Sequence, residues 1–166
     1  MVAQNSGSDS GDPVLVGEMS RAEIEEALPH WVDEEILATP DPIAASSLAD
    51  VLHGVEVTVL LGTWCSDSRR ELARLWRALD DAGLVTADPI RYIGVDRGMQ
   101  EPGVWVAGRD LRLVPTFIVE REGQELGRVV ESAPQGIEID LLALIRGEKT
   151  GVVSASDQLD LDEDEE

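Results

Sequence analysis

Residues 55–68 read VEVTVLLGTWCSDS and contain the strongest structural signal in the chain. The run from Val55 to Leu61 is mostly valine and leucine, and no alternation of polar and apolar residues continues past Thr58. This pattern is typical of a central strand that is buried on both faces. Because Gly62-Thr63 breaks the strand, Cys65 is expected at the switch from this strand to the next element.

A helix is predicted over residues 66–81, because apolar residues recur there at spacings of three and four. Gly83 follows where a helix C-cap glycine belongs. Residues 89–95 then predict a second strand, and a strand-helix-strand order implies parallel pairing. The chain is therefore expected to be α/β. The apolar positions of the helix are Leu72, Leu75, Trp76 and Leu79, and its outward positions are Arg69, Arg70, Arg74 and Arg77.

Extra helices are predicted ahead of this core. Ser20 and Glu23 have the spacing of a capping box, so a short helix is expected over residues 20–28. Another helical turn is expected over residues 30–37. A third helix is expected to begin with Asp41 as cap and Pro42 at the first position, and to end at Gly54. Trp31 and Ile36 are predicted to face inward from the second of these segments. The third helix carries the apolar residues Ile43, Leu48, Val51 and Leu52.

The second half of the chain predicts a hairpin followed by a helix. Residues 96–110 are rich in glycine and are expected to form a loop, with a short helix around 104–106. Short apolar strands are predicted at 116–120 and 126–130, and the glycine-containing turn between them indicates antiparallel pairing. A last helix is predicted over 137–147.

These elements predict one domain. Its expected limits are residues 19–149, with a core over 55–146. Residues 1–18 are expected to form a flexible N-terminal segment, and residues 150–166 a disordered acidic tail, because neither segment carries a periodic apolar face.

Acidic residues dominate the charge of the chain, with 34 Asp and Glu against 13 Lys and Arg. Residues 1–50 hold eleven acids and one base, and residues 150–166 hold seven acids and no base. This distribution argues against binding to nucleic acid or to an anionic membrane through a basic face. No apolar run reaches the roughly 20 residues of a transmembrane helix, and no signal-peptide stretch is present, so a cytoplasmic protein is expected.

Cys65 is the one cysteine of the chain, so no disulfide can form within it. With only His30 and His53, no Cys/His cluster has zinc spacing, and neither a metal nor a cofactor is predicted. Because the chain has a single cysteine, any redox chemistry must be monothiol.

The surroundings of Cys65 act on its thiolate in opposite directions. Unpaired amides and the helix dipole at the predicted helix start stabilise a thiolate. Ser68 lies on the same helical face and could donate a hydrogen bond to the sulfur, whereas the Asp67 carboxylate raises the cost of the thiolate. The sequence leaves the net effect open, and Ser68 and Asp67 are also ordinary residues for the first turn of a helix, as is Ser66.

The chain resembles the thioredoxin-like superfamily over about residues 55–146, and more closely a bacterial branch in which Gly-Thr-Trp-Cys is followed by Asp-Ser. Trp64-Cys65 matches the Trp-Cys that opens the active-site motif, and Ser68 occupies the position of the second cysteine. Val114-Pro115-Thr116 matches the turn whose proline is cis. The resemblance implies a central mixed sheet, β-α-β then β-β-α, flanked by helices. It also implies that the backbone before Pro115 pairs with an extended substrate segment beside the sulfur.

Three departures from the family pattern bear on activity. Ser68 replaces the resolving cysteine, Val59 lies where thioredoxins carry a buried aspartate, and Ala73 replaces a helix-kinking proline. The first two losses agree, because a buried acid that serves a resolving thiol has no task without that thiol. The pattern is that of a monothiol site or of a retired dithiol site.

Two functions follow as hypotheses. In the first, Cys65 performs thiol-disulfide exchange with a protein or a low-molecular-weight thiol or disulfide, and an external thiol releases the product. In the second, the domain is a non-catalytic binding module that uses the groove between Trp64 and Pro115. Iron-sulfur carriage fits poorly, because the Cys-Gly-Phe-Ser motif of monothiol glutaredoxins is missing. The oligomeric state is not predicted.

Overall fold

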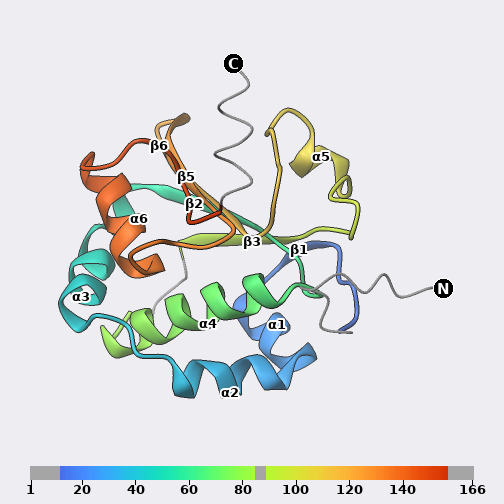
Figure 1. Cartoon of the computed structure of the whole chain (residues 1–166), viewed down its shortest axis with the longest axis horizontal. Coiled ribbons are helices and arrows are strands. Elements are labelled where there is room, and N and C mark those ends of the chain that lie inside the picture. Colours follow the sequence, from blue (N-terminus) through green and yellow to red (C-terminus); the bar gives the residue numbers. More distant parts are fainter. Residues whose placement is uncertain (1–11, 85–88, 157–166) are drawn as a thin grey trace.

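The computed structural model describes residues 12–84 and 89–156. In these residues the chain forms a six-stranded mixed sheet with the strand order β1-β3-β2-β4-β5-β6 (Figure 1). Its two central pairs define the topology, since β2 is parallel to β3 and antiparallel to β4. The strands are β1 Gly17–Met19, β2 Glu56–Leu61, β3 Ile90–Gly94, β4 Thr116–Arg121, β5 Gln124–Val130 and β6 Gly151–Val153.

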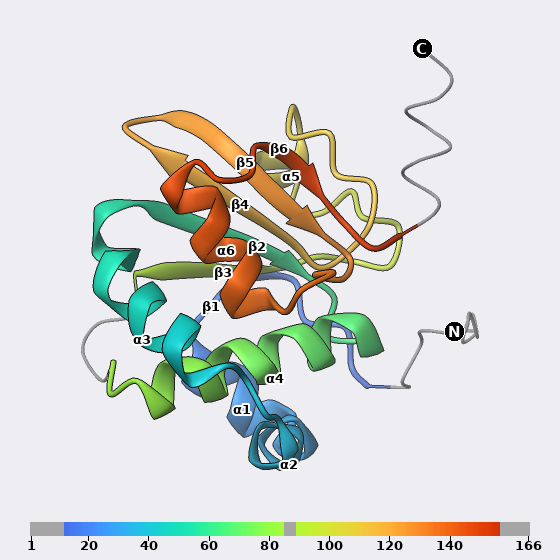
Figure 2. The ribbon, with the colours of Figure 1, turned by 60° about the vertical axis from the view of Figure 1, so that its left-hand side comes forward.

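The helices lie mainly on one face of the sheet, and the segment between β3 and β4 covers the other face (Figure 2). The helices are α1 Arg21–Ala27, α2 Pro29–Leu37, α3 Pro42–Val51, α4 Ser66–Asp81, α5 Gly103–Val106 and α6 Ile137–Arg146, and a 3-10 turn covers Leu52–Gly54. The predicted α/β class, the parallel β2-β3 pair and the antiparallel β4-β5 hairpin are confirmed. Of the helices in the described residues, only α5, which has four residues, belongs to the segment on the second face.

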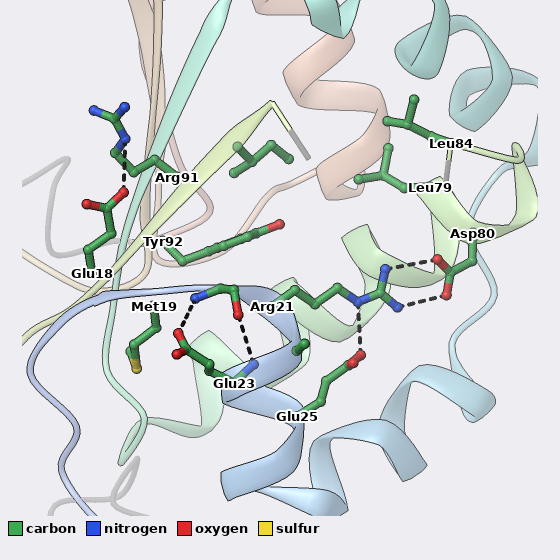
Figure 3. Close-up of a pocket in the computed structure, with 13 residues that line it drawn as sticks. Glu18, Met19, Arg21, Glu23, Glu25, Leu79, Asp80, Leu84, Arg91 and Tyr92 are labelled. Atoms are coloured by element: carbon green, nitrogen blue, oxygen red, sulfur yellow. Dashed lines mark hydrogen bonds and ion pairs between the residues drawn. The ribbon is translucent and has the colours of Figure 1, made fainter. Parts of the chain in front are cut away.

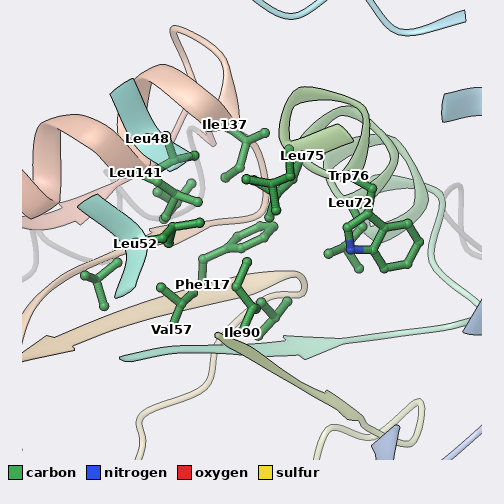
Figure 4. Close-up of a cluster of buried hydrophobic side chains, with 14 of the residues drawn as sticks. Leu48, Leu52, Val57, Leu72, Leu75, Trp76, Ile90, Phe117, Ile137 and Leu141 are labelled. Carbon is green, nitrogen blue, oxygen red and sulfur yellow. The ribbon is translucent and has the colours of Figure 1, made fainter. Parts of the chain in front are cut away.

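The main core lies between the sheet and the helices (Figure 4). Phe117 of β4 points toward Leu75 of α4 and Leu141 of α6, and all three side chains are fully buried. A smaller core on the opposite face contains Leu60, Ile93 and Ile118 together with the site residues Trp64, Cys65 and Val114, and side chains of the segment between β3 and β4 pack against it. Burial of β2 on both faces is therefore confirmed.

The predicted helix caps are present. Ser20 Oγ accepts from the Glu23 N–H at 3.0 Å, and Glu23 Oε1 accepts from the Ser20 N–H at 2.9 Å, which is the capping box. Asp41 Oδ1 accepts from the Ile43 and Ala44 amides at the start of α3. Gly83 has a φ of +80°, the left-handed conformation that a glycine after a helix supplies.

Both predicted domain limits need correction. The limit at residue 18 falls inside β1, which pairs with β3, so the folded part begins before residue 19. The limit at residue 149 leaves out β6, which pairs with β5 and buries Val153. Each strand has three residues, too few for a periodic pattern to reveal. Residues 1–11 and 157–166 of the two predicted tails lie outside the described residues.

One inward position in the N-terminal helices was predicted wrongly, because Ile36 is 66% exposed. Ile43 of α3 is also exposed, at 79%. Helix α2 instead turns Trp31 and Glu35 inward, four residues apart on one face. The outward arginines of α4 are engaged rather than merely solvated, because ion pairs link them to Glu34, Asp67, Glu138 and Asp81.

Candidate functional site

The site lies at one end of the sheet, where the two predicted motifs meet. Parallel pairing places the end of β3 beside the end of β2, and antiparallel pairing places the start of β4 there as well. Cys65 follows β2 and Val114 lies just before β4, so these two residues, 49 apart in sequence, become neighbours. The structure thus brings together the segments 64–68 and 114–116.

Cys65 is the N-cap residue of α4, with extended backbone angles of φ −109° and ψ 124°. Its N–H donates to Gly62 O at 3.0 Å and its carbonyl accepts from the Arg69 N–H at 3.1 Å. The thiol donates toward Val114 O at an Sγ–O distance of 3.7 Å. Only 3% of Cys65 is exposed, so the sulfur is covered rather than presented to solvent.

Burial raises the pKa of the Cys65 thiol above its ordinary value and is the largest influence on it. The backbone N–H and hydroxyl of Ser68 and the backbone N–H of Asp67 lower the pKa, whereas the Asp67 carboxylate raises it further. These influences together raise the pKa of the Cys65 thiol, so the neutral thiol is favoured over the thiolate. A functional Cys65 must therefore be uncovered before it becomes a good nucleophile.

Ser68 and Asp67 have structural partners of their own. Ser68 is fully buried, and its Oγ accepts from the Gly62 N–H at 3.0 Å, which ties the turn before Cys65 to the first turn of α4. Asp67 forms an ion pair with Arg70 at 2.8 Å, one helical turn away. Ser66 begins the helix and is half-buried.

Trp64 is built into the small core and leaves 8% of its surface exposed. Its Nε1–H donates to Val95 O at 3.0 Å, which joins the turn after β2 to the end of β3. Gly62 makes this packing possible, because a Cβ atom there would lie 2.7 Å from the indole ring. The guanidinium of Arg97 lies over the ring, 5.8 Å from its centroid.

The predicted substrate turn is buried as well. Val114-Pro115 is a cis peptide bond, as the resemblance implies, and Glu101-Pro102 is a second one. Pro115 O accepts from the Glu131 N–H at 2.8 Å, and the Thr116 hydroxyl donates to Leu113 O at 2.7 Å. Val114 O already faces the Cys65 thiol, so a groove between Trp64 and Pro115 is not open in this structure.

Sequence reasoning missed the N-terminal segment as a part of this site. The Leu15 N–H donates to Thr63 Oγ1 at 3.0 Å, and the same hydroxyl donates to Pro13 O at 2.6 Å. Gly94 at the end of β3 lets this segment approach, because a Cβ atom there would collide with Leu15 O. Thr63, next to Trp64-Cys65, gave no signal of this contact, since a threonine after a strand is ordinary.

A cavity lies elsewhere in the molecule, between α1, the neighbouring strands β1 and β3, and the end of α4 (Figure 3). Its volume is about 750 Å³, and Met19, Arg21, Asp80 and Tyr92 are among its lining residues. None of the predicted site residues lines it. Figure 3 shows Arg21 in contact with both Asp80 and Glu25, so these three charged residues of the cavity wall are paired with one another.

Within residues 12–84 and 89–156, no three His, Cys, Asp or Glu side chains are grouped so that they could hold a metal ion. No helix in this part of the chain has both the length and the apolar character needed to cross a membrane.

Comparisons with known proteins give no family. No protein-family model and no curated protein matches the chain. Among solved structures, the fold is similar to a protein of unknown function from Pseudomonas aeruginosa, with a TM-score of 0.46 and 21% sequence identity. The match covers 78% of this chain and 88% of that one.

Proposed function

We propose that the chain is a thioredoxin-like protein that performs monothiol thiol-disulfide exchange through Cys65. The observation that supports this best is the contact of Cys65 Sγ with Val114 O at 3.7 Å, at the N-cap of the 16-residue helix α4. A helix N-terminus stabilises a thiolate, and a backbone carbonyl beside the sulfur marks the place where a partner segment would lie.

The exchange needs two thiols in sequence. The Cys65 thiol first loses its proton to solvent, and the thiolate attacks one sulfur of a partner disulfide. A bond forms between Cys65 and that sulfur, while the other sulfur leaves as a thiolate. An external thiolate then attacks the partner sulfur of the mixed disulfide. A new disulfide forms between these two sulfurs, and Cys65 leaves as a thiolate. Ser68 cannot replace this second thiol, because a hydroxyl does not displace a sulfur.

The buried state of Cys65 sets the condition for this reaction. The sulfur is covered by the small core, by Val114 and by the turn that Ser68 holds, so exchange requires movement of at least one of these segments. The thiol should therefore react slowly in the closed protein and faster when the site opens.

The test is the rate of Cys65 alkylation, followed by mass, together with the yield of mixed disulfide from a small aromatic disulfide. Because Cys65 is the one cysteine, every adduct is assigned to it, and Cys65→Ser is the matched blank. We expect a single stable mixed disulfide that an added low-molecular-weight thiol releases. A thiol that forms no mixed disulfide in the folded protein, yet does so after unfolding, would exclude the proposed exchange.

The burial of Cys65 also supports a second candidate function, a non-catalytic binding module. A buried, protonated thiol is also typical of a cysteine that has only a structural role. The variant Cys65→Ala distinguishes the two functions. If the domain is a binding module, wild type and variant retain a protein partner equally well. If the partner is held by exchange, it is bound through the Cys65 sulfur and the variant loses it.

A further inference from the structure

Strand β1 forms one edge of the sheet. Within the described residues it pairs with β3 on one side, and no strand lies on its other side. The segment ahead of β1 continues the same edge, because Leu15 is bound to Thr63 and lies against Gly94 at the end of β3. We call residues 14–19 the β1 edge. The main-chain N–H and C=O groups of such an edge can pair with a further strand.

The pairing with β3 decides which main-chain groups face outward from the β1 edge. The Val95 N–H donates to Leu61 O of β2. Because main-chain groups alternate in direction along a strand, those of Gly94 turn the other way, toward β1. Gly94 lies opposite Gly17, so the groups of Gly17 face inward. Glu18, the next residue, therefore directs its N–H and C=O groups away from β3.

Val16 presents its main-chain groups in the same outward direction. Leu15 O lies against Gly94, on the inward side. A trans peptide bond points its C=O and its N–H in opposite directions, so the Val16 N–H points outward. The inward Gly17 N–H places the Val16 C=O outward for the same reason. Val16 and Glu18 thus offer two N–H and two C=O groups to a further strand.

A groove runs along the β1 edge, between residues 14–19 and helix α1. Its volume is about 510 Å³. The edge contributes Val14 and Val16 to its lining, and these side chains are 37% and 48% exposed. Helix α1 contributes Glu23, Glu26 and Ala27. The groove therefore combines exposed apolar surface from the edge with carboxylates from the helix.

The carboxylates of α1 keep their negative charge. Glu23 Oε1 accepts from the Ser20 N–H, a neutral group that leaves the charge uncompensated. Glu26 forms no ion pair within the part of the chain that the structure describes. Glu18 also lines the groove, but it is paired with Arg91 at 3.2 Å, so its charge is offset. No Lys or Arg is among the lining residues, and the groove therefore attracts cations.

An added strand would meet these glutamates with every second side chain. Successive side chains of a strand point to opposite faces of the sheet, and α1 lies on the face that the helices cover (Figure 2). Basic residues at alternate positions would therefore reach Glu23 and Glu26. Apolar residues between them would remove the exposed valines from water.

We propose that the β1 edge binds an extended segment of another protein, in which basic and apolar residues alternate, as a seventh strand of the sheet. Main-chain hydrogen bonds to Val16 and Glu18 provide the affinity, and the alternation provides the specificity. A second copy of this chain fits less well, because it would bring further carboxylates to the carboxylates of α1. The binding does not depend on any reaction of Cys65.

The probe for this proposal is the peptide Val-Lys-Val-Lys-Val-Lys, blocked at both ends and added to the full chain. Its six residues match the length of the β1 edge. NMR follows the amide signals and their hydrogen exchange. We expect the Val16 and Glu18 amides to shift, and their exchange to slow about tenfold when the peptide concentration is about ten times its Kd. The Val152 amide in β6, at the opposite edge of the sheet, should not respond.

Three control peptides separate the alternating pattern from charge alone. Val-Val-Val-Lys-Lys-Lys has the same composition without the alternation, and Val-Glu-Val-Glu-Val-Glu reverses the charge. Val-Lys-Pro-Lys-Val-Lys loses a main-chain N–H in the middle of the strand. Each should bind about tenfold more weakly than the probe, or not at all.

A double variant, Glu23→Gln with Glu26→Gln, tests the carboxylates of α1. Glutamine at position 23 keeps the capping box, so the helix start is preserved. We expect the probe to bind about fivefold more weakly. The matched control, Asp33→Asn with Asp50→Asn, removes the same charge from exposed positions on α2 and α3 and should leave the affinity unchanged.

Unchanged Val16 and Glu18 amides in the presence of the probe would overturn the proposal. Equal binding of the Val-Glu peptide, or an equal response of β6, would also overturn it, because the edge would then lack specificity. Without peptide, slower exchange of the Val16 amide at higher protein concentration would assign the edge to a second copy and would contradict the proposed partner.

Discussion

Glu35 Oε1 accepts a hydrogen bond of 2.9 Å from the Arg21 guanidinium, which joins α2 to α1. The same guanidinium binds Glu25 at 2.9 Å and Asp80 at 2.7 Å, so three carboxylates share one cation. Burial, followed by the neighbouring Glu25, raises the pKa of Glu35 to about 8, and Arg21 offsets this only in part. The cluster therefore retains a proton at neutral pH.

The first prediction is that this proton makes stability depend on pH. Because the folded pKa of Glu35 is raised, its contribution to stability is fully present below the ordinary pKa of 4.5 and is lost as the pH rises through about 8. Glu35→Gln should gain stability relative to wild type over that range, by about 1.4 kcal/mol for each pH unit between the two pKa values. Thermal unfolding at pH 5, 7 and 9 measures this gain. Asp33→Asn, an exposed acid on the same helix, serves as control. Parallel pH profiles for wild type and Glu35→Gln would contradict the prediction.

A second prediction separates a buried ion pair from an exposed one on the same helix. Glu138 is fully buried and accepts from Arg74 at 2.7 and 2.8 Å and from the Asp41 N–H at 2.8 Å. Arg74→Ala leaves that carboxylate without its cation and should cost about 3 kcal/mol. Arg69→Ala removes a half-exposed pair with Glu34 and should cost less than about 1 kcal/mol. Urea unfolding of the two variants gives both values, and equal losses would refute the distinction.

A third prediction concerns the N-terminal segment that covers Thr63. Gly94→Ala places a Cβ atom against Leu15 O and 2.6 Å from the Met19 side chain. We expect a loss of about 2 kcal/mol and faster hydrogen exchange of the Leu15 amide, which donates to Thr63. Gly54→Ala is the matched control, because no atom lies within 4 Å of a Cβ there. Unchanged exchange at Leu15 in Gly94→Ala would show that the segment does not need this close approach.

The elements that could be predicted from the sequence are those with long periodic patterns. The β2-α4-β3 unit, the hairpin and α6 each carry enough apolar residues in a regular phase to be recognised. The burial of Glu35 could not be read from such a pattern, because it depends on Arg21 from another helix. Strands β1 and β6 could not be predicted in this way, since three residues are too few to show a periodic pattern.

The proximity of the two motifs could be predicted from the sequence, whereas the burial of Cys65 could not. The spacing of Trp64-Cys65 and the sequence Val114-Pro115 correctly brought two segments together. That Cys65 is covered depends on the packing of Trp64 against Val95 and of the segment between β3 and β4 against the sheet, which is tertiary information. The motif predicts a reactive thiol, but Cys65 can react only after the residues that cover it have moved.

A fourth prediction tests the electrostatic control of Cys65. The Asp67 carboxylate raises the pKa of the thiol, and it is the smallest of the influences on that pKa. Asp67→Asn should therefore lower the thiol pKa slightly and speed alkylation at neutral pH about twofold. Arg70→Gln, which removes the partner of Asp67 but keeps the carboxylate, should not speed it. The pH dependence of the alkylation rate provides the measurement, and a slower Asp67→Asn would reverse the sign assigned here.

The last prediction restores a second thiol at the position of Ser68. Ser68→Cys removes the hydroxyl that accepts from the Gly62 N–H, so a loss of about 1 kcal/mol is expected before oxidation. The new thiol faces Cys65 from the same turn of α4, because the Ser68 hydroxyl already acts on the Cys65 sulfur. Under mild oxidation the variant should lose two free thiols together, as an internal disulfide forms and two electrons pass to the oxidant.

Ser68→Ala is the matched control, since it removes the same hydrogen bond without supplying sulfur. It should unfold at a similar temperature to reduced Ser68→Cys and keep its single free thiol after the same oxidation. Turnover of a disulfide substrate by Ser68→Cys should remain low, because Val59 is fully buried and supplies no acid to deprotonate the new thiol. Two free thiols that persist in Ser68→Cys, together with a wild-type Cys65 that forms no mixed disulfide, would leave the binding module as the function of this fold.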